Sequence, residues 1–204
     1  MTEKIGNVVL DMTYYPGEDH YSDGDIEDEL LQVAMEHEEE EFPKIIEERK
    51  SWPFFYHLSP FRTYFCCGHN DTEHHIGSGC GAITGALAKR VGSVTCIDLS
   101  KKRSLVNAYR NKKQDNITIM VGNFKDIEPH LPCDYDYVLL IGVFEYGRAY
   151  IGGETPYEDF MSICNRHRKD SGRLVIAIEN KFGLKYWAGC REDHLGTYFT
   201  GIEG

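Results

Sequence analysis

Four short apolar runs constrain the fold of this chain more than any other feature of its sequence. They are SVTCIDL (93–99), ITIMVG (117–122), YVLLIGVF (137–144) and RLVIAIE (173–179). Each run is apolar at consecutive positions, which is typical of strands in a parallel sheet covered by helices on both faces. Helical patterns lie between the runs, at 81–90, 101–112 and 157–168. This alternation predicts right-handed βαβ units and a doubly wound, mostly parallel α/β sheet.

The first 60 residues differ from the rest of the chain in charge and pattern. Residues 1–50 hold 16 acidic and 4 basic side chains, whereas the remaining residues hold 17 and 18. One apolar helical face is formed by Ile26, Leu30, Val33 and Ala34. We therefore predict an acidic helical appendage or lid at residues 1–60 and a main domain at residues 61–204. The acidic run from Glu38 to Glu41 is expected to be a solvated helix face.

Composition also bears on location and partners. The N-terminus lacks the basic start and apolar core of a signal peptide, and no apolar run approaches the length of a membrane span. The seven cysteines are therefore expected to be free thiols. A net charge of −11 without a basic face argues against nucleic-acid binding. We predict a cytoplasmic protein with no membrane or nucleic-acid partner, and its oligomeric state stays open.

Two segments resemble metal sites only in part. The first is a crowded set of thiols and imidazoles, comprising Cys66, Cys67, His69, His74, His75 and Cys80. Its spacing matches no standard zinc site. The second, residues 19–30, resembles a calcium loop but has Tyr21 and Leu30 where oxygen ligands are needed. We predict no metal.

A glycine-rich loop precedes the helical pattern at 81–90. Gly77, Gly79 and Gly81 surround Ser78, and a helical segment follows. Glycines allow a tight turn and close approach of a ligand to the backbone, and helix amides favour negative charge. Asp98 follows Gly77 by 21 residues at the end of the next strand, where a carboxylate can accept hydrogen bonds from ribose hydroxyls. The pair indicates a nucleoside cofactor and is also compatible with the dinucleotide fingerprint.

The residues after the later strands favour one kind of cofactor. The strand ends run into Asn123-Phe124, Glu145-Tyr146 and Asn180. This order, over about residues 58–180, resembles the Rossmann-like class I S-adenosylmethionine-dependent methyltransferases. The resemblance implies that the cofactor is S-adenosylmethionine, that Asp98 holds the ribose and that Asn123 and Phe124 flank the adenine. The whole implied cofactor set is His75, Gly77, Ser78, Gly79, Gly81, Asp98, Leu99, Asn123, Phe124 and Gly142.

Two features depart from the family's pattern. His75 stands where the family has an acidic residue that anchors the methionine end of the cofactor, and His74 replaces an aliphatic residue. A neutral imidazole accepts one hydrogen bond but supplies no negative charge. Binding is then weaker, or a carboxylate between Asp11 and Asp28 replaces the acid. Family members also end with two further strands, whereas only one weak strand fits here, at residues 196–202, so we expect truncated C-terminal strands, as in a fragment of a longer protein.

Three side chains are candidates for catalysis. Glu145 comes first as a general base, because its strand-end position should face the methyl group, and Tyr146 and His20 come next. Glu145 could equally serve the start of a helix. The acidic appendage disfavours a polyanionic substrate, so we expect a small-molecule acceptor such as a metabolite or a sugar. An NAD-dependent oxidoreductase and a non-catalytic Rossmann-like module with a degenerate cofactor site remain as alternatives.

Overall fold

A computed structural model describes residues 1–19, 24–59, 72–180, 182–191 and 196–198. The strands are β1 (Thr2–Ile5), β2 (Val8–Tyr14), β3 (Thr72–Ile76), β4 (Ser93–Asp98), β5 (Ile117–Gly122), β6 (Tyr135–Ile141) and β7 (Arg168–Ala177). The longer helices are α1 (Asp25–Glu36), α2 (Phe42–Arg49), α3 (Trp52–Leu58), α5 (Lys101–Arg110) and α8 (Pro156–His167). The short ones are η1 (Glu39–Glu41), α4 (Thr84–Ala88), α6 (Phe124–Ile127), η3 (Glu128–His130), η4 (Phe144–Tyr146), α7 (Gly147–Tyr150) and α9 (Leu184–Trp187).

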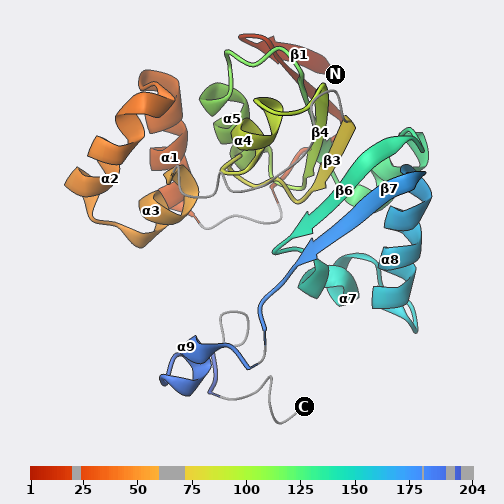
Figure 1. Cartoon of the computed structure of the whole chain (residues 1–204). Coiled ribbons are helices and arrows are strands. Elements are labelled where there is room, and N and C mark those ends of the chain that lie inside the picture. The colour runs from red at the N-terminus through yellow and green to blue at the C-terminus, as the bar shows by residue number, and fades with distance from the viewer. Residues whose placement is uncertain (20–23, 60–71, 181, 192–195, 199–204) are drawn as a thin grey trace.

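The strands form a single sheet in the order β1-β2-β5-β4-β3-β6-β7 (Figure 1). Every neighbouring pair is parallel except β1 with β2. Strand β3 lies between β4 and β6, with Ile76 paired to Ile97 on one side and to Leu140 on the other. The expected doubly wound, mostly parallel sheet is therefore confirmed.

The first 14 residues differ from the expected helical appendage, because they form two strands of the main sheet. β2 pairs in parallel with β5, and its Val8 and Leu10 side chains are fully buried in the core. Val8 and Leu10 are alternate residues of β2, as expected for a strand with one buried face. The apolar pattern is too short to predict a strand at the start of a segment rich in acidic residues. Residues 24–59 are helical as expected. The domain boundary near residue 60 stays a prediction.

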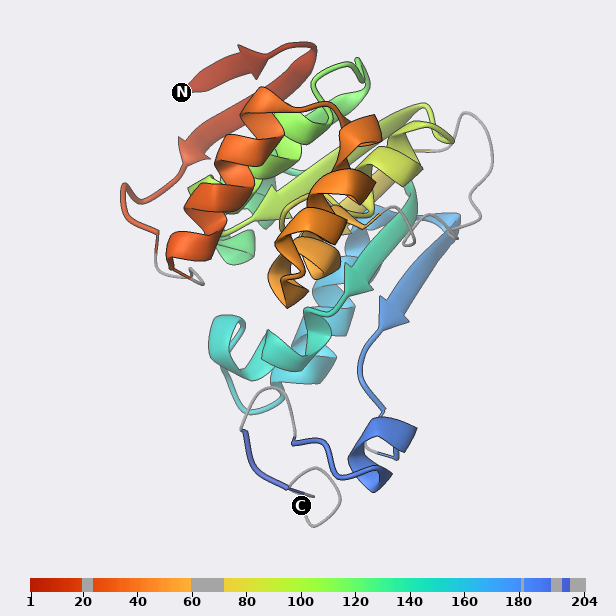
Figure 2. The same cartoon turned by 90° about the vertical axis from the view of Figure 1, so that its left-hand side faces the viewer.

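Helices cover both faces of the sheet. One core cluster joins the sheet to α4 and α5, and another joins it to α6 and α8. The helices α1, α2 and α3 form an additional layer outside α4 and α5, visible in orange in Figure 1 and in front of the sheet in Figure 2. As a result, Leu105 of α5 packs toward the sheet, whereas Val106 and Tyr109 pack against this outer layer. The helical pattern at 101–112 predicts that all three face the sheet, which is correct for Leu105 alone.

The acidic run at the start of the outer layer is docked rather than solvated. Glu39 forms an ion pair with Lys89 at 2.8 Å, and Glu38 binds Lys112 and Lys113, each at 2.9 Å. Lys89 directly follows α4, and Lys112 and Lys113 follow α5, so the expected solvated face is wrong for Glu38 and Glu39.

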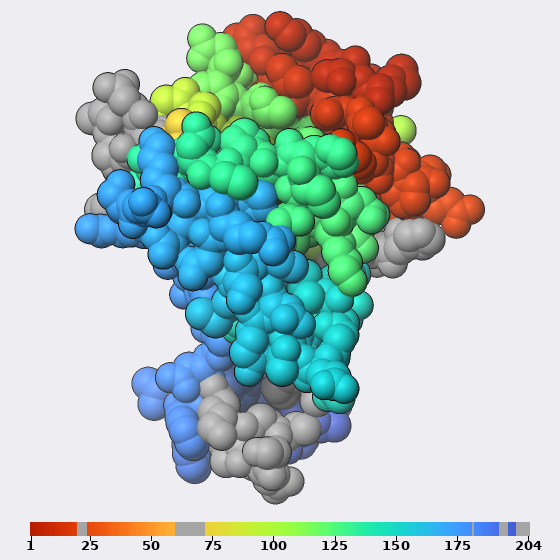
Figure 3. Space-filling view, turned by 90° about the vertical axis from the view of Figure 1, so that its right-hand side faces the viewer, coloured from red at the N-terminus to blue at the C-terminus, as the bar shows by residue number. Residues whose placement is uncertain are grey.

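Strand β7 forms one edge of the sheet, and no further strand pairs with it among the described residues. Beyond it the chain leaves the body of the molecule toward α9 (Figure 3). Of the weak strand expected at 196–202, only residues 196–198 are described, and they are not in a strand. No helix in the described part of the chain is long and apolar enough to cross a bilayer.

Candidate active site

The carboxyl edge of the sheet brings the predicted cofactor residues together. Because β5, β4, β3 and β6 are adjacent and parallel, the residues that follow them lie side by side at one edge. In sheet order these residues are Asn123, Asp98, Gly77 and Gly142. Ligands of open α/β sheets bind at this edge, so the predicted cofactor residues lie at the usual ligand-binding position of the fold.

The three loop glycines are needed for different reasons. All have positive φ, at 68° for Gly77, 53° for Gly79 and 76° for Gly81. A Cβ on Gly77 would stand 2.0 Å from Cγ1 of Val143, and one on Gly81 would stand 2.2 Å from Oδ1 of Asn107. Among the described residues, a Cβ on Gly79 would meet nothing within 4 Å. Gly77 and Gly81 therefore serve close packing, whereas Gly79 borders open space that a ligand can enter.

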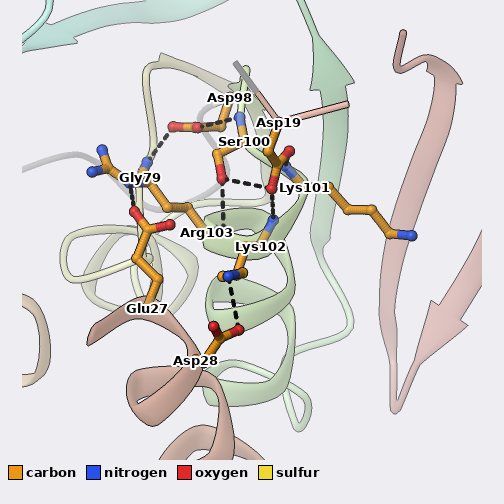
Figure 4. Close-up of polar contacts among 9 residues, drawn as sticks. All are labelled: Asp19, Glu27, Asp28, Gly79, Asp98, Ser100, Lys101, Lys102 and Arg103. Atoms are coloured by element: carbon orange, nitrogen blue, oxygen red, sulfur yellow. Dashed lines mark hydrogen bonds and ion pairs between the residues drawn. The ribbon is translucent and has the colours of Figure 1, made fainter. Parts of the chain in front are cut away.

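Asp98 links the glycine loop to the start of α5. Its carboxylate accepts a hydrogen bond from the Gly79 amide at 2.7 Å and another from the Ser100 amide at 3.0 Å (Figure 4). Burial raises the pKa of the Asp98 carboxyl above its ordinary value. Each carboxylate oxygen keeps further acceptor capacity for ribose hydroxyls. The neighbouring Leu99 is half-buried.

A buried amide pair on α5, absent from the sequence predictions, supports the loop. Asn107 donates to the Ser78 hydroxyl at 3.3 Å and to the Thr84 hydroxyl at 3.2 Å, and it accepts from Asn111 at 2.9 Å. Both asparagines are buried. The sequence does contain a signal for this pair. Asn107 and Asn111 are four residues apart, so they lie on one side of the helix, and buried amides need hydrogen-bond partners.

The two residues expected beside the adenine behave differently. Asn123 caps α6, with its side-chain oxygen accepting from the Lys125 amide at 3.0 Å. The ring of Phe124 packs in the core, 5.7 Å from the Phe160 ring and 6.2 Å from the His74 ring. This burial differs from the expectation that the Phe124 side chain flanks the cofactor. The role of Asn123 stays a prediction.

The catalytic candidates Glu145 and Tyr146 follow β6. Gly142 directly follows β6 and has a φ of 67°. A Cβ at this position would stand 4.0 Å from Oε1 of Glu145. The Glu145 carboxylate is therefore at the carboxyl edge, as expected, and its side chain is half-buried. Tyr146 is half-buried too. His20 lies outside the described residues.

His75 lies in the interior of β3, paired with Cys96 and Leu139. Burial lowers its pKa to about 4, so the imidazole is neutral near pH 7, and its buried Nδ1 has no hydrogen-bond partner in the described part of the chain. Beside it, His74 stacks on Tyr135 with ring centroids 5.0 Å apart, and burial lowers its pKa to about 3. The role of His75 at the methionine end of the cofactor stays a prediction.

Asp98 and the open space at Gly79 together fit a nucleoside cofactor. Within the described residues, no group of three or more His, Cys, Asp or Glu could hold a metal ion. Cys66, Cys67 and His69 of the crowded set lie outside those residues.

Comparison with known proteins decides the family. The sequence model of the methyltransferase domain matches residues 74–176, which is half of the chain. The chain belongs to the class I S-adenosylmethionine-dependent methyltransferases. The cofactor of the domain is accordingly S-adenosylmethionine. The family therefore favours a methyltransferase over the alternative of an NAD-dependent oxidoreductase.

Individual proteins are also similar to this chain. A probable cobalt-precorrin-6B C(15)-methyltransferase (decarboxylating) of Methanothermobacter thermautotrophicus is 29% identical over 121 residues, which cover 56% of this chain and 57% of that protein. The structure of precorrin 8w decarboxylase from Methanobacterium thermoautotrophicum is 27% identical, with a TM-score of 0.45 and coverage of 59% and 60%. Less than two thirds of each of these relatives is therefore matched.

A third comparison shows the fold alone. Phosphoethanolamine N-methyltransferase 1 of Haemonchus contortus, solved with phosphoethanolamine and S-adenosylhomocysteine, is 17% identical with a TM-score of 0.50. The match covers 75% of this chain and 34% of that protein.

Proposed function

We propose that this protein transfers a methyl group from S-adenosylmethionine to a small-molecule acceptor, such as a metabolite or a sugar. The observation that carries the proposal is the convergence of the glycine loop, Asp98 and Glu145 at one edge of adjacent parallel strands. This convergence supplies a cofactor-binding end and a reactive end in one site.

Each part of the edge has a role in the proposal. S-adenosylmethionine, when bound, supplies an electrophilic methyl group on a sulfonium sulfur. Asp98 accepts hydrogen bonds from the ribose, Gly79 admits the ligand close to the backbone, and Leu99 and Asn123 border the adenine. Glu145 removes a proton from an acceptor that is protonated near neutral pH, and Tyr146 helps to orient that acceptor.

The small-molecule acceptor is supported by the archaeal relative, whose name describes a cobalt-precorrin methyltransferase. The acidic N-terminal region, with 16 acidic against 4 basic residues in positions 1–50, argues in the same direction because it repels polyanions. A cytoplasmic location and the lack of nucleic-acid and membrane partners stay predictions from composition.

Calorimetric titration with S-adenosylhomocysteine, with NAD in parallel, tests the cofactor assignment. We expect micromolar binding of S-adenosylhomocysteine only, weakened at least about tenfold by Asp98→Ala because charge-assisted hydrogen bonds are lost. Asp134→Ala, at an exposed carboxylate before β6, is the matched control and should bind normally. A folded wild-type protein that binds NAD or neither ligand contradicts the proposal.

The role of Glu145 needs a kinetic test on an acceptor found by screening. Glu145→Gln keeps the shape of the side chain and removes its basicity. We expect the methyl-transfer rate to fall about 10²–10⁴-fold while S-adenosylhomocysteine affinity stays within about twofold. An unchanged rate would assign Glu145 to the start of η4 instead.

A further inference from the structure

The N-terminal segment reaches the cofactor edge because β2 is parallel to β5. Strand β2 ends at Tyr14, opposite Gly122, so the chain leaves the sheet at the same edge as Asp98. The residues that follow run toward the start of α5, where the Lys101 ammonium lies 5.8 Å from the centre of the Tyr15 ring. A segment from the start of the chain thus becomes a neighbour of the cofactor loop.

Asp19, in this segment, is bonded to the first turn of α5. Its carboxylate accepts from the Lys101 amide at 2.7 Å, from the Lys102 amide at 3.1 Å and from the Ser100 hydroxyl at 3.3 Å (Figure 4). Ser100 also donates its amide to Asp98 at 3.0 Å. A single residue therefore connects Asp19 to the carboxylate assigned to the ribose.

We propose that Asp19 is a positioning and specificity residue of the cofactor site. Its positioning role is to fix the turn from Asp98 to Ser100 by binding the Ser100 hydroxyl. Its specificity role is to accept from the Lys101 and Lys102 amides at the start of α5, which a phosphate group on the ribose would otherwise bind. The inference rests on the proposed function, because Asp98 must bind the ribose for the turn to matter.

The physical basis is competition for one set of donors. Amides at the start of a helix, together with the helix dipole, favour an anion. In this chain the anion is built in, since the Asp19 carboxylate already binds Lys101 and Lys102. A phosphate on the adjacent ribose hydroxyl would find these donors taken and would meet two carboxylates linked through Ser100. A ribose with free hydroxyls can instead donate to Asp98.

Two variants separate geometry from charge. Asp19→Ala removes both the cap and the charge, whereas Asp19→Asn keeps an oxygen that can cap α5. Asp28→Asn is the matched control, because Asp28 is an exposed carboxylate in the same acidic region. It also contacts Lys102, but it pairs with the side-chain ammonium, at 2.8 Å, whereas Asp19 accepts from the backbone amide. Circular dichroism and thermal unfolding first establish that each variant is folded.

The measurements are calorimetric affinities for S-adenosylhomocysteine, adenosine and adenosine 2′-monophosphate. For Asp19→Ala we expect S-adenosylhomocysteine to bind roughly five- to tenfold more weakly, and the preference for adenosine over its 2′-phosphate to fall at least about tenfold. Asp19→Asn should keep the affinity for S-adenosylhomocysteine within about twofold of wild type, and it should still lose the preference for adenosine over its 2′-phosphate. A purely structural role would weaken all three ligands alike.

Three results overturn the inference or its premise, and they differ. Asp19→Ala with wild-type affinities for all three ligands overturns the role of Asp19 alone. Equal changes in Asp28→Asn show that general acidity, rather than Asp19, sets the preference. A wild-type protein that does not bind S-adenosylhomocysteine overturns the proposed function and the inference with it.

Discussion

His74 and His75 place two imidazoles inside a strand that is buried on both faces. Their exposed fractions are 0% and 2%, and the pKa of each is lowered by burial. In the unfolded chain both would titrate near pH 6.5. The unfolded state therefore binds more protons than the folded state between that pH and about pH 4, so the stability contribution is complete above pH 6.5 and is lost as the pH falls.

We predict that the free energy of unfolding falls by on the order of 1 kcal/mol per pH unit for each of these histidines between neutral pH and about pH 5. Urea unfolding across this range measures the slope. His75→Leu should remove about half of this slope, because only His74 of the pair then remains to be protonated in the unfolded chain. A wild-type stability that is level over this range contradicts the prediction.

At the scale of the element, the glycine loop is fixed by what surrounds it. Gly77 is closed in by Val143 from the end of β6 and Gly81 by Asn107 of α5, while Gly79 faces open space. The loop thus joins β6 and α5 to the end of β3, and only its central glycine is available to a ligand.

Alanine substitutions should separate these two kinds of glycine. Gly79→Ala meets only the cost of a positive φ, about 1–2 kcal/mol, or roughly 2–8 °C in Tm. Gly77→Ala adds a clash with Val143 and should lower Tm further. Gly152→Ala, with φ of 69° and nothing near its Cβ, gives the cost of φ alone. Calorimetric scans compare the three, and equal losses at Gly77 and Gly152 would show that the loop relaxes around the clash.

At the scale of the whole molecule, ion pairs add to the apolar packing that holds the outer helices against α5. Glu27 of α1 is fully buried and binds Arg103 of α5 at 2.5 Å, with 12% of the Arg103 side chain exposed. The Glu38 pairs are more open, since 43% of its side chain is exposed. The acidic region therefore docks through one buried ion pair and several solvent-screened ones.

We predict that neutralising these two carboxylates has very different costs. Glu27→Gln should lower the free energy of unfolding by about 3–5 kcal/mol, because it removes the buried negative charge that faces the Arg103 guanidinium. Glu38→Gln should cost at most about 1 kcal/mol. Denaturant unfolding measures both, and adding salt should reduce only the second difference. Similar costs would mean that the Arg103 side chain moves to solvent.

The sequence was sufficient wherever a local pattern determined the outcome. The strands at 93–98 and 117–122 follow from consecutive apolar residues, and Ser100 caps α5 by accepting from the Arg103 amide at 3.2 Å, as its position predicts. The spacing from Gly77 to Asp98 indicated a nucleoside site because parallel strands carry such residues to one edge. The family assignment rests on the same residues.

Other features were decided only by the tertiary structure. β1 and β2 belong to the sheet because β2 pairs with β5, more than 100 residues away along the chain. Glu38 is docked because the segment after α5 presents two lysines to it, and Phe124 is buried because Phe160 lies across from it. Asn107 and Asp19 support the site through partners distant in sequence. Periodicity and spacing describe what a segment can form, whereas which segments meet depends on burying apolar surface and pairing charges across the whole chain.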